Sequence, residues 1–167
     1  MLLEKALKNQ QQAQEVIDEL DIYGIWESYG AKANLIGSLP TGLLMKNKDI
    51  DFHIYSDNFS ITDSFGAMAR LAENQKIKHI TYINLLDTEE MCLEWHAWYE
   101  DQEKGKWKLD MIHLLNASPD AGKMEKVRDR INALMTPEIK QTILSIKNDI
   151  PDDKPIMGIE IYMAVLR

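Results

Sequence analysis

The segment 48–56, with the sequence KDIDFHIYS, alternates polar and apolar side chains with a period of two. This period predicts a β-strand whose isoleucine and phenylalanine side chains face a core. Two carboxylates, Asp49 and Asp51, share the opposite face with His53. Charged groups in a core strand are costly unless they are paired or bound to a metal. We therefore expect this strand to hold a charged ligand on its polar face.

A Gly-Ser pair, Gly37 and Ser38, lies upstream of this strand and ends a short extended run. The residues after the pair, 39–47, have the length of a short helix with Ser38 as its cap. Free N–H groups at the start of a helix, together with the positive end of the helix dipole, suit a triphosphate. The alternative for the pair is an ordinary turn between a strand and a helix.

A third carboxylate, Asp110, interrupts the apolar run WKLDMIHLL of a later predicted strand. Aspartates at positions i and i+2 of a strand point the same way, so their oxygens can converge on hard metal ions. With Asp110 added, such a cluster could hold two ions about 3.5–4 Å apart. The alternatives are a solvated strand face for Asp49 and Asp51, and pairing of Asp110 with Lys108 or another lysine across the hairpin.

These residues together carry a family resemblance. Gly37 and Ser38, a spacer of ten residues, the pair Asp49 and Asp51, and a later Asp110 are similar to the signature of the DNA polymerase β-like nucleotidyltransferases. Among the branches of this superfamily, the small bacterial lincosamide and aminoglycoside nucleotidyltransferases are similar to the chain in length and layout. The resemblance covers residues 33–113. A departure is Lys48, which stands where the family often has a small or polar residue and which could contact phosphate.

The resemblance implies an enzyme that transfers a nucleoside monophosphate, here AMP, from an NTP to a hydroxyl of a small molecule. It implies two Mg²⁺ ions bound by Asp49, Asp51 and Asp110, with Asp110 also helping to deprotonate the acceptor. Gly37 and Ser38 would hold the triphosphate. Two alternatives stay open: transfer to a protein side chain, as in toxin–antitoxin systems, and a catalytically inactive module that binds a partner or dimerises.

The resemblance also implies an α+β fold, in which a mixed β-sheet is flanked by helices. The periodicity predicts a nucleotidyltransferase core with N-terminal helices over residues 1–115, and a helical C-terminal cap over residues 116–167. Four aromatic residues gather around a predicted hairpin, where they either pack the sheet or form a stacking platform for a ring. These residues are Trp95, Trp98, Tyr99 and Trp107.

The net charge of −8 disfavours a nucleic-acid polymer as partner, because such binding uses clustered lysine and arginine. Cys92 is the single cysteine, so no internal disulfide can form. Neither a signal peptide nor an apolar stretch that could span a membrane is apparent, which leads us to expect a cytoplasmic protein. A homodimer is compatible with these features. The sequence assigns no role to His53, His96 or Tyr162.

Overall fold

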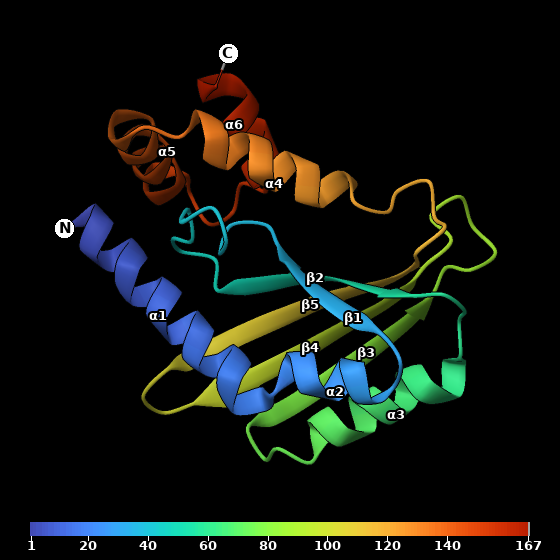
Figure 1. The fold of residues 1–167 in the computed structure, drawn as a ribbon. Coiled ribbons are helices and arrows are strands. Elements are labelled where there is room, and N and C mark those ends of the chain that lie inside the picture. The colour runs from blue at the N-terminus through green and yellow to red at the C-terminus, as the bar shows by residue number, and fades with distance from the viewer. Residues whose placement is uncertain (167) are drawn as a thin grey trace.

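A five-stranded sheet in the order β1-β2-β5-β4-β3 forms the centre of the computed structural model, which describes residues 1–166 (Figure 1). β2 and β5 run parallel, and the other neighbouring strands run antiparallel. The mixed sheet expected from the sequence is therefore confirmed. The strands are β1 (Lys32–Ile36), β2 (Asp49–Ser56), β3 (Ile77–Asn84), β4 (Leu93–Asp101) and β5 (Gly105–Leu115).

Helices lie on both sides of this sheet (Figure 1). α1 to α3 pack on one face, and α4 to α6 stand over the other side near β1 and β2. None of the helices within residues 1–166 is long and apolar enough to cross a membrane. The helices are α1 (Leu2–Leu20), α2 (Ile22–Ser28), α3 (Ile61–Ala72), α4 (Lys123–Leu134), α5 (Pro137–Asp149) and α6 (Gly158–Val165).

The main core fills the space between the sheet and helices α1 to α3. The apolar positions of β2 face this core as the alternation predicts, and Ile50, Phe52 and Ile54 are fully buried. Trp95, Tyr99 and Trp107 are buried in the same core, so these three aromatics pack the sheet and are not free to stack on a ligand. Trp98 points to the opposite face.

A second apolar cluster joins the C-terminal helices to the rest of the chain. It combines residues of α4, α5 and α6 with Ala6 of α1 and with Leu43 and Met45 of the loop before β2. The loop that carries the Gly-Ser pair is thus held from both sides. This packing places α5 and α6 beside the start of β2 (Figure 1).

The helix predicted after Ser38 does not form. Residues 37–42 make turns in which the N–H of Leu43 donates to the carbonyl of Ser38 at 2.9 Å, and the Thr41 hydroxyl donates to the same oxygen at 3.0 Å. Gly42 has φ +73°, a left-handed conformation that is incompatible with continuing a helix.

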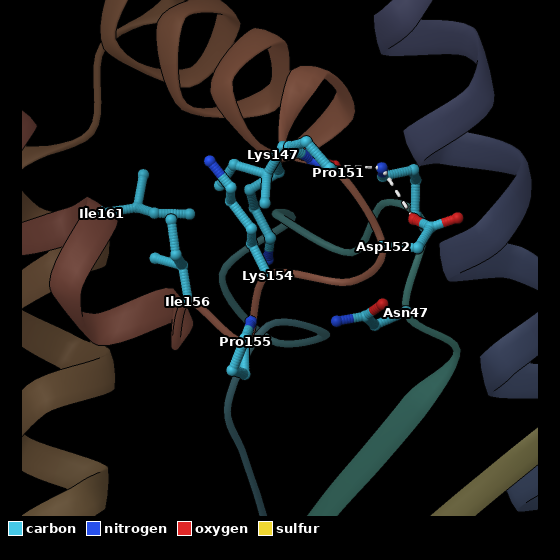
Figure 2. A pocket seen from close by; sticks show the side chains of 10 residues that line it. Asn47, Lys147, Pro151, Asp152, Lys154, Pro155, Ile156 and Ile161 are labelled. Atoms are coloured by element: carbon cyan, nitrogen blue, oxygen red, sulfur yellow. Dashed lines mark hydrogen bonds and ion pairs between the residues drawn. The ribbon is translucent and has the colours of Figure 1, made fainter.

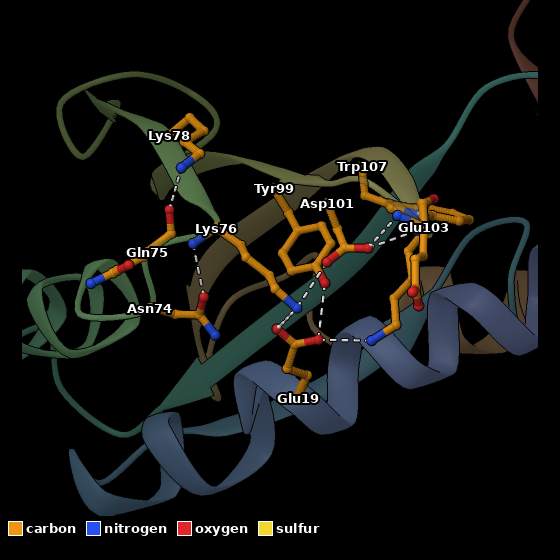
Figure 3. A network of polar contacts seen from close by, with 10 residues as sticks. Glu19, Asn74, Gln75, Lys76, Lys78, Tyr99, Asp101, Glu103 and Trp107 are labelled. Carbon is orange, nitrogen blue, oxygen red and sulfur yellow. Dashed lines mark hydrogen bonds and ion pairs between the residues drawn. The ribbon is translucent and has the colours of Figure 1, made fainter.

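A polar network fixes α1 to the far end of the sheet (Figure 3). Glu19 of α1 contacts Lys76 at 2.8 Å and Lys104 at 2.7 Å, and the Tyr99 hydroxyl donates to it at 2.9 Å. Lys76 also contacts Asp101 at 2.9 Å. Burial opposes ionisation of Glu19, but the two lysines and the tyrosine lower its pKa to about 2. Glu19 therefore stays charged near neutral pH.

The β5 histidine, His113, is buried on the core side without a charged partner. Its Nε2 lies 2.7 Å from the Ser56 hydroxyl and its Nδ1 lies 3.4 Å from the Ser64 hydroxyl. Burial lowers the pKa of His113 from 6.5 to about 4. Between about pH 6.5 and pH 4, the ring is therefore neutral in the native state but protonated in the unfolded chain.

We expect this histidine to make the protein less stable as the pH falls from about 6.5 towards 4, because the unfolded state binds the extra proton in that window. His113→Gln keeps a hydrogen-bonding side chain and removes the titration. Between pH 7.5 and pH 5, the wild type should lose about 2 kcal/mol more unfolding free energy than the variant. Urea unfolding at both pH values measures this. Equal losses would contradict the assignment.

Candidate active site

The three predicted carboxylates lie on one face of the sheet, opposite the main core. In the parallel pairing of β2 and β5, Asp51 stands directly beside Asp110, and Asp49 stands beside Lys108. On the other side of β5, Asp110 faces His96 of β4. The row of Asp51, Asp110 and His96 thus crosses three neighbouring strands.

Burial and mutual repulsion disfavour the charged forms of the carboxylates, although Lys108 and Lys147 lie nearby. Burial, followed by the negative charges of Asp110 and Asp49, raises the pKa of Asp51 to about 7. Burial and the charge of Asp110 also raise the pKa of Asp49. Oxygen donors that repel one another in a half-buried position are the chemistry that a hard divalent cation relieves. The residues present therefore fit Mg²⁺.

The three aspartates share this face, but their oxygens are not gathered at metal-binding spacing. Oδ1 of Asp110 contacts Lys108 Nζ at 2.9 Å and also takes a hydrogen bond from His96 Nδ1. Within residues 1–166, the one set of three potential ligand atoms that all lie within 4.8 Å of one another belongs to other residues. Closing the aspartate cluster around a metal therefore requires movements of carboxylate side chains.

That other set consists of Glu90, Cys92 and Glu94, at the start of β4. Burial, and then the nearby Glu94 and Glu90, raise the pKa of the Cys92 thiol to about 11. A thiol must lose its proton to become a good metal ligand. The surroundings of Cys92 thus oppose metal binding there.

The glycine of the Gly-Ser pair is required by its contact with Asp51. Gly37 has φ +77°, and a Cβ atom at this position would lie 2.4 Å from Asp51 Oδ2. The backbone of the turn therefore lies directly against one of the candidate metal ligands. Any other residue would be strained and would also displace that carboxylate.

The serine of the pair is the centre of a polar cluster with α5 and α6. Lys147 Nζ donates to Ser38 Oγ at 2.9 Å and to the Leu43 carbonyl at 2.7 Å. The Tyr162 hydroxyl lies 3.0 Å from Ser38 Oγ and 3.2 Å from Lys147 Nζ. Burial lowers the pKa of Lys147 to about 8, although Asp51 and Asp49 favour its charge. Sequence reasoning missed Lys147, because nothing in its helix distinguishes it from the other lysines.

Positive charge beside the Gly-Ser turn thus comes from a lysine and not from a helix end. The sequence-based expectation of a helix dipole behind Ser38 is wrong, since no helix follows. Lys147 is the group that can supply the corresponding attraction for phosphate.

Lys48, which the sequence predicted as a phosphate contact, and His53, which was given no role, lie at the margins of the site. The Lys48 amine contacts the Lys104 carbonyl at 3.4 Å and lies 5.0 Å from the centre of the Trp107 ring, on the hairpin side of Asp49. His53 Nδ1 lies 3.3 Å from the hydroxyl of Tyr55, which itself donates to Glu125 of α4 at 3.1 Å. His53 is therefore part of the connection between the sheet and α4.

Two pockets meet at the chain segment that leads into Asp49. One, of about 280 Å³, lies between the end of α5, the following loop and α6, and Figure 2 shows Lys147 among its lining residues. The other, of about 450 Å³, lies over the strands and is lined by Asp49, Trp98 and Lys108. Lys46 and Asn47 line both pockets. Asp49 therefore lines one of two spaces that could each take part of a substrate, and the segment before it lines both.

No family model and no curated protein sequence matches the chain, whereas solved structures do. The poly(U) polymerase Cid1 bound to MgATP aligns with a TM-score of 0.69 and 15% identity, over 93% of this chain and 49% of that chain. The poly(A) polymerase complex GLD-2–GLD-3 aligns with a TM-score of 0.65 and 8% identity, over 98% of this chain and 56% of that chain.

A cytoplasmic RNA terminal U-transferase also aligns, with a TM-score of 0.57 and 17% identity over 84% of this chain and 40% of that chain. The chain thus spans about half the length of these structures. At such low identity the likeness establishes the fold. The chain has the α+β nucleotidyltransferase fold that its motif predicted.

We expect Gly37→Ala to destabilise the protein by at least about 2 kcal/mol, because it combines a strained φ with a collision against Asp51. Gly30→Ala is the matched control: Gly30 has φ +76°, and nothing lies within 4 Å of a Cβ placed there. The free energy of unfolding of Gly30→Ala should fall by only about 1 kcal/mol. Equal losses in urea unfolding would show that the contact with Asp51 does not matter.

Proposed function

We propose that the chain is a Mg²⁺-dependent nucleotidyltransferase that moves AMP from an NTP to a hydroxyl group of a small molecule. The observation that carries this proposal is the parallel pairing that sets Asp51 beside Asp110, two register positions from Asp49 and against the Gly37 turn. Structural neighbours named as poly(U) and poly(A) polymerases, one of them bound to MgATP, support the reaction class.

In this proposal Asp49, Asp51 and Asp110 hold the metal. Bound Mg²⁺ supplies positive charge for the phosphates and for the attacking and leaving oxygens. Asp110 lies at the edge of the trio, next to the open part of the sheet, so its carboxylate is placed to accept the proton of an acceptor hydroxyl. Its contact with Lys108 would have to adjust when the metal enters.

The donor nucleotide would lie on the α5 and α6 side of the aspartates. The backbone of Gly37 and the hydroxyl of Ser38 face this side together with Lys147. A half-buried ammonium group attracts a triphosphate more strongly than an exposed one, because water screens its charge less. Lys147 therefore takes the role that the sequence suggested for a helix dipole.

The acceptor would lie on the other side, in the pocket of about 450 Å³ beside Asp49. A pocket of this size suits a small molecule. Lys48 and Lys108 line it, and Glu100 and Asp49 add negative charge. An RNA end is the second candidate, favoured by neighbours such as the RNA terminal U-transferase. The net charge of −8 weighs against a long polyanion.

Radiolabelled ATP and UTP, incubated separately with the protein, Mg²⁺ and fractionated cell extract, test the proposal. Label should appear in the small-molecule fraction with ATP, together with released pyrophosphate. Label on RNA or on protein would identify a different acceptor class. Absence of pyrophosphate release with both nucleotides in every fraction would contradict enzymatic activity.

Asp51→Asn should lower nucleotidyl transfer by at least about 100-fold while the protein still folds, because it removes a metal ligand together with a repelling charge. Turnover and circular dichroism measure the two effects. Asp87→Asn is the control, since Asp87 is an exposed aspartate of the β3–β4 loop. Wild-type turnover in Asp51→Asn would show that the metal ligands have been wrongly assigned.

Lys147→Met should weaken binding of a non-hydrolysable ATP analogue by about tenfold, because it removes one charge-assisted contact with phosphate. Calorimetric titration in Mg²⁺ measures this. Lys126→Met changes an exposed lysine of α4 and should bind the analogue like the wild type. If Lys147→Met also binds normally, the triphosphate lies elsewhere.

A further inference from the structure

The two oxygens of the Asp110 carboxylate have different surroundings. Oδ1 takes both the Lys108 ammonium at 2.9 Å and the hydrogen bond from His96 Nδ1. Oδ2 has no hydrogen-bond donor among residues 1–166. The side chain is thus held by one oxygen, while the other stays available.

His96 is itself fixed between two carboxylates on the same face of the sheet. Its Nδ1 faces Asp110 across the β4–β5 pairing, and its Nε2 lies 3.4 Å from Oε2 of Glu94, two residues earlier on β4. The side chains of His96 and Asp110 are only 18% and 20% exposed. A ring held at both nitrogens in a half-buried position has little freedom to turn.

Lys108 alone gives Asp110 less orientation than His96 does. The Lys108 side chain is 34% exposed, and its single point charge lies at the end of a flexible stem. The imidazole ring, in contrast, is planar and has two contacts. Hydrogen bonds from a fixed neighbouring side chain to a metal ligand, such as the one from His96 to Asp110, orient the ligands in known metal sites.

We propose that His96 is a positioning residue for Asp110. By holding Oδ1 towards β4, it leaves Oδ2 for the metal that Asp49 and Asp51 also bind, and it reduces the rotamer freedom that Asp110 loses when the metal enters. This inference rests on the proposed function, because it assumes that Asp110 is a metal ligand. Neither the sequence motif nor the structural likeness assigns a role to this histidine.

The test is the binding of Mn²⁺, followed by electron paramagnetic resonance in the presence of a non-hydrolysable ATP analogue. His96→Leu removes the donor and should weaken binding of one Mn²⁺ ion by about tenfold. His96→Asn places an amide N–H near the position of Nδ1 and should restore affinity to within about threefold of wild type. His79→Leu is the control, because His79 lies on the same face but stacks on Trp98.

The outcomes separate this inference from the proposed function. A wild-type protein that binds no Mn²⁺ with the analogue contradicts the proposed function itself. If the wild type binds Mn²⁺ and Asp110→Asn weakens it, but His96→Leu binds like the wild type, the positioning role is overturned alone. Equal weakening in His96→Leu and His96→Asn, with both variants folded, overturns it as well, because the retained donor would then have no effect.

Discussion

The parallel pairing of β2 with β5 is the constraint on which the rest of the site depends. It is set by apolar residues on the buried face, where Ile50 pairs with Leu109 and Phe52 pairs with Met111, all fully buried. A shift of one residue would turn every side chain of one strand to the other face. Hydrophobic burial therefore holds Asp51 beside Asp110 in spite of their repulsion.

Two lysines partly compensate the negative charge of the aspartates in the absence of a metal. Lys108 pairs with Asp110 on one side, and Lys147 stands near Asp49 and Asp51 on the other. This compensation is incomplete, because the pKa of Asp51 remains near 7. The arrangement thus keeps the fold stable while leaving a demand for positive charge, which is the condition a metal-dependent site requires.

The sequence alone predicted a strand over residues 48–56 and its polar face, because the two-residue period is a local signal, and it offered Asp110 of a later strand as a third carboxylate. The helix after Ser38 was wrong because the apolar residues of that segment are buried in an irregular loop: Leu43, Leu44 and Met45 are at most 1% exposed. Lys147 and His96 could not be predicted as site residues. Their roles come from tertiary contacts, and 109 positions separate Lys147 from Ser38.

A crystal structure with Mg²⁺ and a non-hydrolysable NTP tests the central claim most directly. The account predicts metal bound between Asp49, Asp51 and Asp110, with the triphosphate beside Gly37 and Ser38. A nucleotide bound elsewhere, with no metal between the three aspartates, would contradict it.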